Sequence, residues 1–355
     1  MSSGKNIVIC LDGTGNQLKA KGNTNVVLLF QMLDLSDPDR QVAYYDPGVG
    51  TFAAPGAWTG VARRTSTLLG LAFGAGIKDN LGQAYTFLMQ HYRPGDRVFL
   101  FGFSRGAYTA RGLTGLVHRP GLMKPGAENM VPYLVNAYTK GDRWSPDDWD
   151  RIDEYADTFC VRTEGSTSMP VHFLGLWDSV KALGYLRWDP KWPYTRKVPN
   201  ARTVRHAVSI DERRRPYAEY VVEADHPGLR EVWFAGVHSD VGGTFTDDSD
   251  LSKIALKWMV DGALEQGILL RRGAYERACS VMEKDAAGVL HRMGWIWSLL
   301  TYRRRQRGAD TQVHASVRSR LAAEVGYRLE PPGADHWDDP DWLKPSPLIL
   351  ARPER

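Results

Sequence analysis

The 355-residue sequence has few cysteines, no long apolar run and almost no excess of either charge. Lys and Arg total 45 against 41 Asp and Glu, a difference too small to indicate a nucleic-acid partner. No apolar stretch approaches the roughly 18 residues that a membrane-spanning helix needs. An odd number of cysteines without CxxC spacing fits neither a disulfide framework nor a zinc site, and the chain has three: Cys10, Cys160 and Cys279.

The N-terminal segment, MSSGKNIVICLDG, also lacks the pattern of a secretory signal. It carries one lysine and a short apolar run, so no signal peptide is predicted and the protein is expected to be made in the cytoplasm. A composition of 43% hydrophobic and 24% charged residues is typical of a folded protein and excludes a disordered or coiled-coil chain.

Short apolar runs that end at turn signals alternate with segments of helical spacing. The spacing predicts helices over residues 77–92 and 107–117. The apolar runs predict strands over residues 6–11, 42–45, 97–103, 171–177 and 231–237. Apolar strands that alternate with helices are typical of a mostly parallel sheet covered on both faces. The sequence therefore predicts an α/β fold.

Two long, polar, Trp-rich stretches interrupt this alternation, at about 120–170 and 184–230. Neither has the pattern of a sheet strand, so both are predicted to form cap segments over the carboxyl ends of the strands. Beyond residue 250 the chain is first helical, then basic, then rich in proline. We therefore predict a catalytic core of residues 1–250 with the two caps inserted, and a helical and irregular extension of residues 251–355 packed on that core.

A GxSxG pentapeptide, Gly102 to Gly106, lies between a predicted strand and a predicted helix. This is the setting of a nucleophile elbow, whose tight turn requires the glycines Gly102 and Gly106 and exposes the hydroxyl of Ser104. The alternative is an ordinary strand-to-helix turn in which Ser104 caps the helix. The setting favours Ser104 as a nucleophile.

A serine nucleophile needs a base, and the base needs an acid to orient it. His238 follows the strand of residues 231–237, and Asp178 follows the strand of residues 171–177. The order Ser104, Asp178, His238 is that of an α/β-hydrolase. Because a carboxylate stabilises the imidazolium, the pKa of His238 is expected to lie above its ordinary value. The rivals are Asp240 as the acid, and His206 and His314, which are interpreted as structural; His206 lies in a helix-like run.

The negative oxygen of a tetrahedral intermediate must meet fixed N–H donors. In this fold one donor is the backbone N–H after the nucleophile, here that of Arg105. The second is predicted in the glycine-rich loop after the first strand, from the backbone of Gly13 and Thr14. The alternative is that this loop is simply a turn.

No cofactor or metal motif is present. The sequence contains neither HExxH nor GxxxxGK[ST], so neither a zinc-protease site nor a phosphate-binding loop is predicted. Four aspartates lie in the loops that carry the predicted site and leave a cation site open as an alternative: Asp12, Asp46, Asp178 and Asp240.

Six segments between residues 12 and 243 resemble the successive motifs of one bacterial family: LDGTGN, YYDPGVGT, GFSRGAYTARGL, FLGLWDSVKALG, HAVSIDERR and VWFAGVHSDVGG. It is the family of α/β-hydrolases similar to the phospholipase effectors of type VI secretion. The resemblance implies an α/β-hydrolase fold and a lipase triad on Ser104, Asp178 and His238. For members that are effectors it also implies phospholipase A activity, delivery outside the cell, and secretion-apparatus or immunity-protein partners.

The sequence thus predicts a serine esterase or lipase that cleaves an acyl ester through an acyl-enzyme, and the resemblance makes a glycerophospholipid its substrate. Tryptophans and arginines that lie near each other in the sequence suit peripheral membrane contact: Trp188, Trp192, Trp295, Trp297, Arg187, Arg196 and Arg303 to Arg305. Two other functions stay open: a soluble esterase or thioesterase for a small acyl substrate, and a hydrolase-derived binding module without activity.

Overall fold

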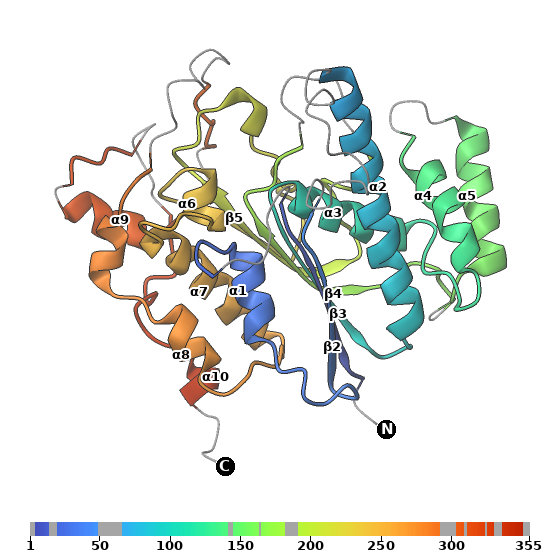
Figure 1. Ribbon diagram of the computed structural model, residues 1–355, viewed down its shortest axis with the longest axis horizontal. Coiled ribbons are helices and arrows are strands. Elements are labelled where there is room, and N and C mark those ends of the chain that lie inside the picture. Colours follow the sequence, from blue (N-terminus) through green and yellow to red (C-terminus); the bar gives the residue numbers. More distant parts are fainter. Residues whose placement is uncertain are drawn as a thin grey trace.

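An eight-stranded parallel sheet forms the centre of the molecule, in the order β2-β1-β3-β4-β5-β6-β7-β8. The structure, a computed structural model, describes residues 4–13, 20–48, 66–140, 145–162, 165–181, 191–291, 303–308, 311–323, 325–329 and 336–350. Helices cover both faces of the sheet (Figure 1), which confirms the predicted α/β fold.

The strands are β1 (Asn6–Leu11), β2 (Gln41–Asp46), β3 (Arg97–Phe103), β4 (Val171–Trp177), β5 (Ala201–Ser209), β6 (Leu229–Phe234), β7 (Gln312–His314) and β8 (Trp337–Asp338). The α-helices are α1 (Asn25–Met32), α2 (Ser66–His91), α3 (Arg105–His118), α4 (Val131–Tyr138), α5 (Pro146–Phe159), α6 (His238–Gly242), α7 (Asp250–Glu265), α8 (Ala274–Cys279), α9 (Ala315–Ala322) and α10 (Pro347–Leu350). Short 3₁₀ turns lie at η2 (Glu128–Met130), η4 (Arg215–Tyr217) and η5 (Glu283–Ala287).

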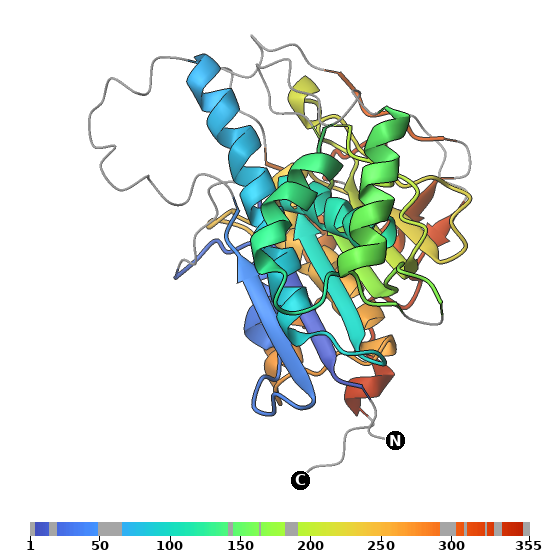
Figure 2. The same cartoon turned by 90° about the vertical axis from the view of Figure 1, so that its right-hand side faces the viewer.

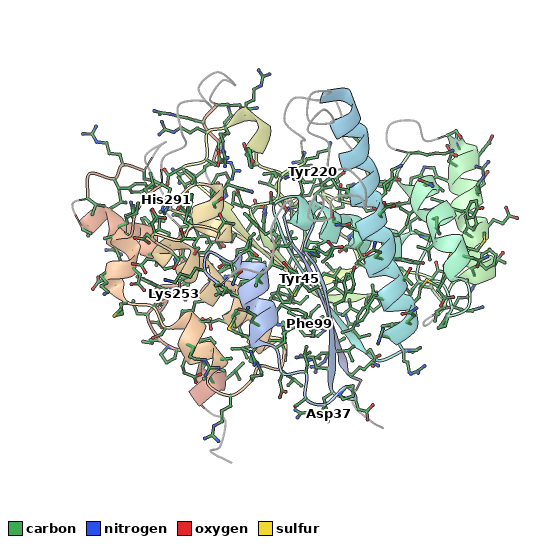
Figure 3. All side chains as sticks on the ribbon, viewed as in Figure 1. Asp37, Tyr45, Phe99, Tyr220, Lys253 and His291 are labelled. Carbon is green, nitrogen blue, oxygen red and sulfur yellow. The ribbon has the colours of Figure 1, made fainter. Side chains whose placement is uncertain are left out.

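The two faces of the sheet bury alternate residues of each strand. In β1, Ile7 and Ile9 pack in the cluster that includes α2, α3 and α4, whereas Val8 and Cys10 pack with α1 and α7. Figure 3 shows Phe99 of β3 in the middle of the molecule, and its ring is fully buried. A sheet buried on both faces needs runs of apolar residues, and these runs made β1, β3 and β4 predictable.

Strand β5 corrects two predictions. Residues 201–209 were expected to lie in a cap segment, with His206 in a helix-like run, but they form a strand between β4 and β6. The run looked polar because it carries Arg205 and His206. Both side chains are buried, and each has an acidic partner, Glu265 for the arginine and Glu231 for the histidine.

The regions predicted as a cap and as an extension also contribute helices and strands to the sheet and to the helical layers that cover it. In the first predicted cap, residues 120–170, α4 packs against α2, and α5 packs against α4 beside the sheet (Figure 2). Beyond residue 250, α7 covers one face and the short strands β7 and β8 extend the sheet. The boundary at residue 250 stays a prediction. Within the described residues, no helix combines the length and the apolar character that crossing a membrane requires.

Candidate active site

Ser104 lies in a strained turn between β3 and α3. Its φ of 60° and ψ of −123° fall outside the regions that L-residues prefer, and such strain is typical of a nucleophile elbow. The Ser104 N–H donates to the carbonyl of Trp177 at 3.0 Å, so the end of β4 fixes the turn.

The glycines of the turn allow close backbone contact. A Cβ on Gly106 would lie 2.2 Å from the carbonyl oxygen of Leu11 and 2.5 Å from that of Asp12. A Cβ on Gly102 would lie 2.6 Å from the oxygen of Gly106. The end of β1 and the start of α3 can therefore meet only where no side chain is present.

Gly106→Ala is expected to destabilise the protein by about 3 kcal/mol, because backbone atoms of two elements must separate. The matched control is Gly82→Ala in α2, where a Cβ would lie 3.7 Å from Val131. This control should leave stability unchanged or raise it, since alanine favours a helix over glycine. Chemical denaturation monitored by fluorescence measures both. Equal stability of the two variants would contradict the close-contact argument.

Three side chains from separate strand ends lie in line. The oxygen Oγ of Ser104 is 2.9 Å from Nε2 of His238, and Nδ1 of His238 is 2.5 Å from Oδ2 of Asp178. All three are buried, and Ser104 is only 5% exposed. The residue is therefore less exposed than the predicted elbow implies.

Several groups fix His238 in this line. It is the first residue of α6 and follows the end of β6 by four positions, rather than directly as predicted. Its backbone N–H donates to Oε2 of Glu212 at 3.2 Å. The ring of Phe103 stacks on the imidazole, with 4.6 Å between the two ring centroids. The ring of Tyr217 meets the imidazole edge-on, with 4.9 Å between the ring centroids.

Asp178 is held on both oxygens. The N–H of Ser209 donates to Oδ1 at 2.8 Å, and its hydroxyl donates to Oδ2 at 3.1 Å. The guanidinium of Arg305 donates to the same two oxygens at 2.5 and 3.0 Å. Sequence reasoning missed the roles of Glu212, Ser209 and Arg305. Glu212 and Ser209 lie in the quoted motif HAVSIDERR, whereas no motif marked Arg305.

The charges of the site set its protonation. Although burial raises the pKa of Asp178, the charge of Arg305 and then the imidazole of His238 hold it well below its ordinary value. Burial lowers the pKa of His238, against the opposing effects of Asp178 and Glu212, and Arg305 lowers it further. Asp178 acts in the expected direction, but the expectation that the pKa of His238 lies above its ordinary value is wrong, because it left out the cost of burying an imidazolium.

Two of the three predicted oxyanion donors, Arg105 and Gly13, lie among the described residues. Arg105 begins α3, so its backbone N–H belongs to the positive end of a 14-residue helix. The N–H of Gly13 donates to the carboxylate of Asp12 at 2.6 Å. Thr14 lies outside the described residues. The oxyanion assignment stays a prediction.

The rival residues have other partners. Asp240 accepts from the N–H of Val237 at 2.9 Å, and its other oxygen lies 2.5 Å from Nδ1 of His291. His206 lies 2.8 Å from Glu231 through Nδ1, and its Nε2 accepts from the N–H of Ser179. His314 caps α9 by accepting from the N–H of Ser316. Of the two aspartates considered as the acid, Asp178 and Asp240, it is Asp178 whose carboxylate contacts the imidazole of His238.

The four aspartates considered for a cation are bonded separately. Asp12 accepts from the hydroxyl of Thr24 at 2.6 Å, and Asp46 accepts from the side chain of Asn80 at 2.8 Å. Asp178 contacts Ser209, Arg305 and His238, whereas Asp240 contacts Val237 and His291. In the part of the chain that the structure describes, no three His, Cys, Asp or Glu side chains are grouped to hold a metal ion.

The interpretation of a Trp- and Arg-rich membrane contact is wrong for two of its residues. Trp192 is 4% exposed in the core beside α3, and Arg305 is 5% exposed against Asp178. Arg196, Arg303 and Arg304 are exposed. Trp188, Trp295, Trp297 and Arg187 lie outside the described residues.

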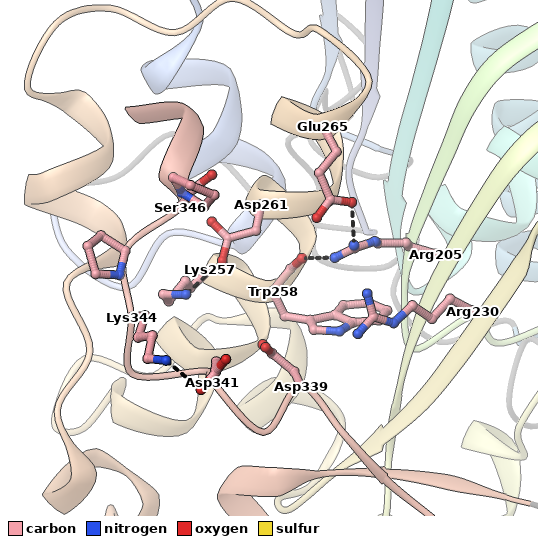
Figure 4. Close-up of a pocket in the computed structure, with 12 residues that line it drawn as sticks. Arg205, Arg230, Lys257, Trp258, Asp261, Glu265, Asp339, Asp341, Lys344 and Ser346 are labelled. Carbon is pink, nitrogen blue, oxygen red and sulfur yellow. Dashed lines mark hydrogen bonds and ion pairs between the residues drawn. The ribbon is translucent and has the colours of Figure 1, made fainter. Parts of the chain in front are cut away.

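A groove of about 470 Å³ lies beside α7 (Figure 4). Several of its charged side chains pair with one another, among them Lys257 with Asp261 at 2.6 Å and Arg205 with Glu265 at 3.0 Å. None of Ser104, Asp178 and His238 lines it. The groove is therefore not the candidate active site.

The parallel sheet, together with a serine, an imidazole and a carboxylate in line at its carboxyl edge, defines an α/β-hydrolase-like protein. The chain belongs to the family of Tle1-like phospholipase effectors of type VI secretion. Residues 5–262 match the family's sequence model, described as "T6SS, Phospholipase effector Tle1-like, catalytic domain". The predicted family resemblance is confirmed.

One curated relative is an uncharacterized protein of Saccharomyces cerevisiae, 38% identical over 219 residues, which are 60% of this chain and 32% of the yeast protein. A crystal structure of an uncharacterized protein from Pseudomonas aeruginosa is similar over 80% of this chain and 50% of its own, with 20% identity and a TM-score of 0.46. The Tle1 effector bound to the VgrG spike is similar over 80% of this chain and 77% of its own, with 15% identity and a TM-score of 0.45. The chain thus spans about a third of the yeast relative.

Proposed function

We propose that the protein is a serine hydrolase that cleaves carboxylic esters through an acyl-enzyme. The observation that carries the proposal is the hydrogen-bonded line from Ser104 through His238 to Asp178, at 2.9 and 2.5 Å. Its first member occupies a strained turn at the start of a helix, which is the geometry that a nucleophilic serine requires.

The chemistry follows from the positions of the atoms. Oγ of Ser104 attacks the carbonyl carbon of the ester while Nε2 of His238 takes the hydroxyl proton. Asp178 holds Nδ1–H and stabilises the imidazolium that forms. The backbone N–H of Arg105 receives the negative oxygen, and the Gly13–Thr14 region supplies a second donor. The N–H of Gly13 would first have to leave the carboxylate of Asp12, to which it donates at 2.6 Å. His238 then protonates the leaving alcohol, and water releases the acyl group by the same steps in reverse order.

The proposed substrate is the acyl ester of a glycerophospholipid. Support comes from membership in a family of phospholipase effectors. A release assay with phospholipid vesicles, run beside a short-chain nitrophenyl ester assay, tests this choice. Hydrolysis of the nitrophenyl ester without any release from vesicles would favour a soluble esterase or thioesterase instead. Delivery by a secretion apparatus to a target outside the cell is also part of the proposal and rests on the same membership.

The nucleophile itself is tested by labelling with a fluorophosphonate, which reacts with activated serines whatever the natural substrate. Peptide mapping should place the label on Ser104. A folded protein that takes up no label would favour the binding-module alternative.

The pH dependence of kcat/KM should follow one ionisation, that of His238. A base accepts the serine proton only when it is neutral, and burial lowers the pKa of His238. The rate should therefore rise with pH through a midpoint below about 6.5, the ordinary value for histidine, and stay level at higher pH. EDTA should leave this profile unchanged. A midpoint above 7 would contradict the lowered pKa of His238, whereas a loss of activity in EDTA that a divalent cation restores would contradict the proposed mechanism.

A further inference from the structure

Arg305 makes a two-pronged contact with Asp178. Nη1 lies 2.5 Å from Oδ1 and Nη2 lies 3.0 Å from Oδ2, so the planar guanidinium meets both carboxylate oxygens. Their side chains are 2% and 1% exposed. Such a buried pair is screened little by solvent, and its geometry constrains the plane of the carboxylate.

The guanidinium is itself fixed by backbone. Nη1 also donates to the carbonyl of Ser209 at 3.0 Å and to its hydroxyl at 2.8 Å, where β5 ends. Nη2 donates to the carbonyl of Tyr217 at 2.6 Å, at the end of η4. The position of Asp178 therefore depends on a side chain that two separate elements hold.

Arg305 comes from a distant part of the chain. It lies 127 positions beyond Asp178, whereas the match to the family's catalytic domain ends at residue 262. The extension after residue 250 thus contributes the strands β7 and β8 to the sheet and a charged side chain, that of Arg305, to the candidate site.

The charges that face His238 come from several elements. Asp178 follows β4, and Glu212 follows β5 and is paired with Arg214 at 2.7 Å. Behind Asp178, the His206 imidazole pairs with Glu231. Asp240, on α6 itself, contacts His291.

Arg305 is the cation that offsets the charge of Asp178. The loss of Arg305 would therefore leave the imidazolium of His238 more strongly stabilised by Asp178.

We infer that Arg305 is a positioning residue of the proposed triad, which orients Asp178 and whose positive charge, added to the effect of burial, disfavours the imidazolium of His238. This inference rests on the proposed function. The Arg305 side chain thus has two separate effects. Its forked guanidinium fixes the orientation of the Asp178 carboxylate, and its positive charge disfavours the imidazolium of His238.

Two variants distinguish these effects. Arg305→Lys keeps the charge and loses the fork, whereas Arg305→Gln loses both. The matched control is Arg320→Gln, which removes an equally buried arginine of the same extension. Arg320 donates to the carbonyls of Ala286 and Gly288 and makes no contact with the triad. The rate of Ser104 labelling by a fluorophosphonate, measured from pH 5 to 9, reports on the base without any knowledge of the substrate.

Both Arg305 variants should label about tenfold more slowly than wild type at pH 8, since the acid is no longer held in place. In Arg305→Gln the ratio of the rates at pH 6 and pH 8 should also fall, by about threefold or more, because His238 protonates more readily. Arg305→Lys and Arg320→Gln should keep the wild-type ratio. Arg320→Gln should also keep the wild-type rate at pH 8, whatever its effect on thermal stability.

The inference is overturned if Arg305→Lys labels at the wild-type rate, or if its ratio shifts. An unchanged ratio in folded Arg305→Gln also overturns it, as does an equal shift in Arg320→Gln. If Arg305→Gln does not fold, Arg305→Lys still carries the test. The absence of Ser104 labelling in the wild-type protein is a different result, because it refutes the proposed function itself.

Discussion

Ser104→Ala should lower kcat for ester hydrolysis by about 10³-fold or more, because the acyl-enzyme cannot form without the hydroxyl. The residual rate would come from the oxyanion donors and from substrate binding. The fold should persist: the change removes one buried oxygen, and the turn is held by the backbone bond from Ser104 to Trp177. A nitrophenyl ester assay measures the loss, and circular dichroism checks the fold.

Thr109→Ala provides a matched control for this variant. Thr109 lies one turn further along α3, is 4% exposed, and donates its hydroxyl to the carbonyl of Arg105. It has no place in the proposed chemistry, so its loss should change kcat by less than about threefold. If correctly folded Ser104→Ala retains near wild-type turnover, Ser104 is not the nucleophile.

The elements of the core were predictable because their apolar runs or helical spacing are unbroken. Strands β1, β3 and β4 have the predicted bounds, and each carries a residue considered for the site just beyond its end. In contrast, β5 carries Arg205 and His206, whose charges and hydrogen bonds are satisfied only by the folded neighbours Glu265 and Glu231. A sequence alone does not show that such partners exist.

The same reason explains why part of the site was missed. Ser104, Asp178 and His238 each follow a predicted strand, and parallel strands bring their carboxyl ends to one edge. Arg305 follows no strand and lies in a run of three arginines, a pattern more typical of a solvated surface. Two of these arginines are exposed and the third is buried, a difference that only the tertiary contacts determine.

Asp178→Asn should lower kcat by about 10⁴-fold, the size of the effect that the equivalent change has in serine proteases. An amide in place of the carboxylate can hold His238 with the wrong nitrogen protonated, so Nε2 no longer accepts the serine proton. Asp240→Asn should reduce kcat by less than about tenfold, because Asp240 contacts Val237 and His291 rather than His238. The same ester assay measures both variants.

The buried arginine complicates this comparison, because Asp178→Asn leaves Arg305 without its anionic partner and removes part of the stability. The double variant Asp178→Asn/Arg305→Gln removes both charges together and should regain part of that stability without regaining activity. A thermal shift assay beside the ester assay therefore separates an unfolded protein from an inactive one. If Asp240→Asn is the inactive variant, or if the folded double variant turns over at the wild-type rate, then Asp178 is not the acid that orients His238.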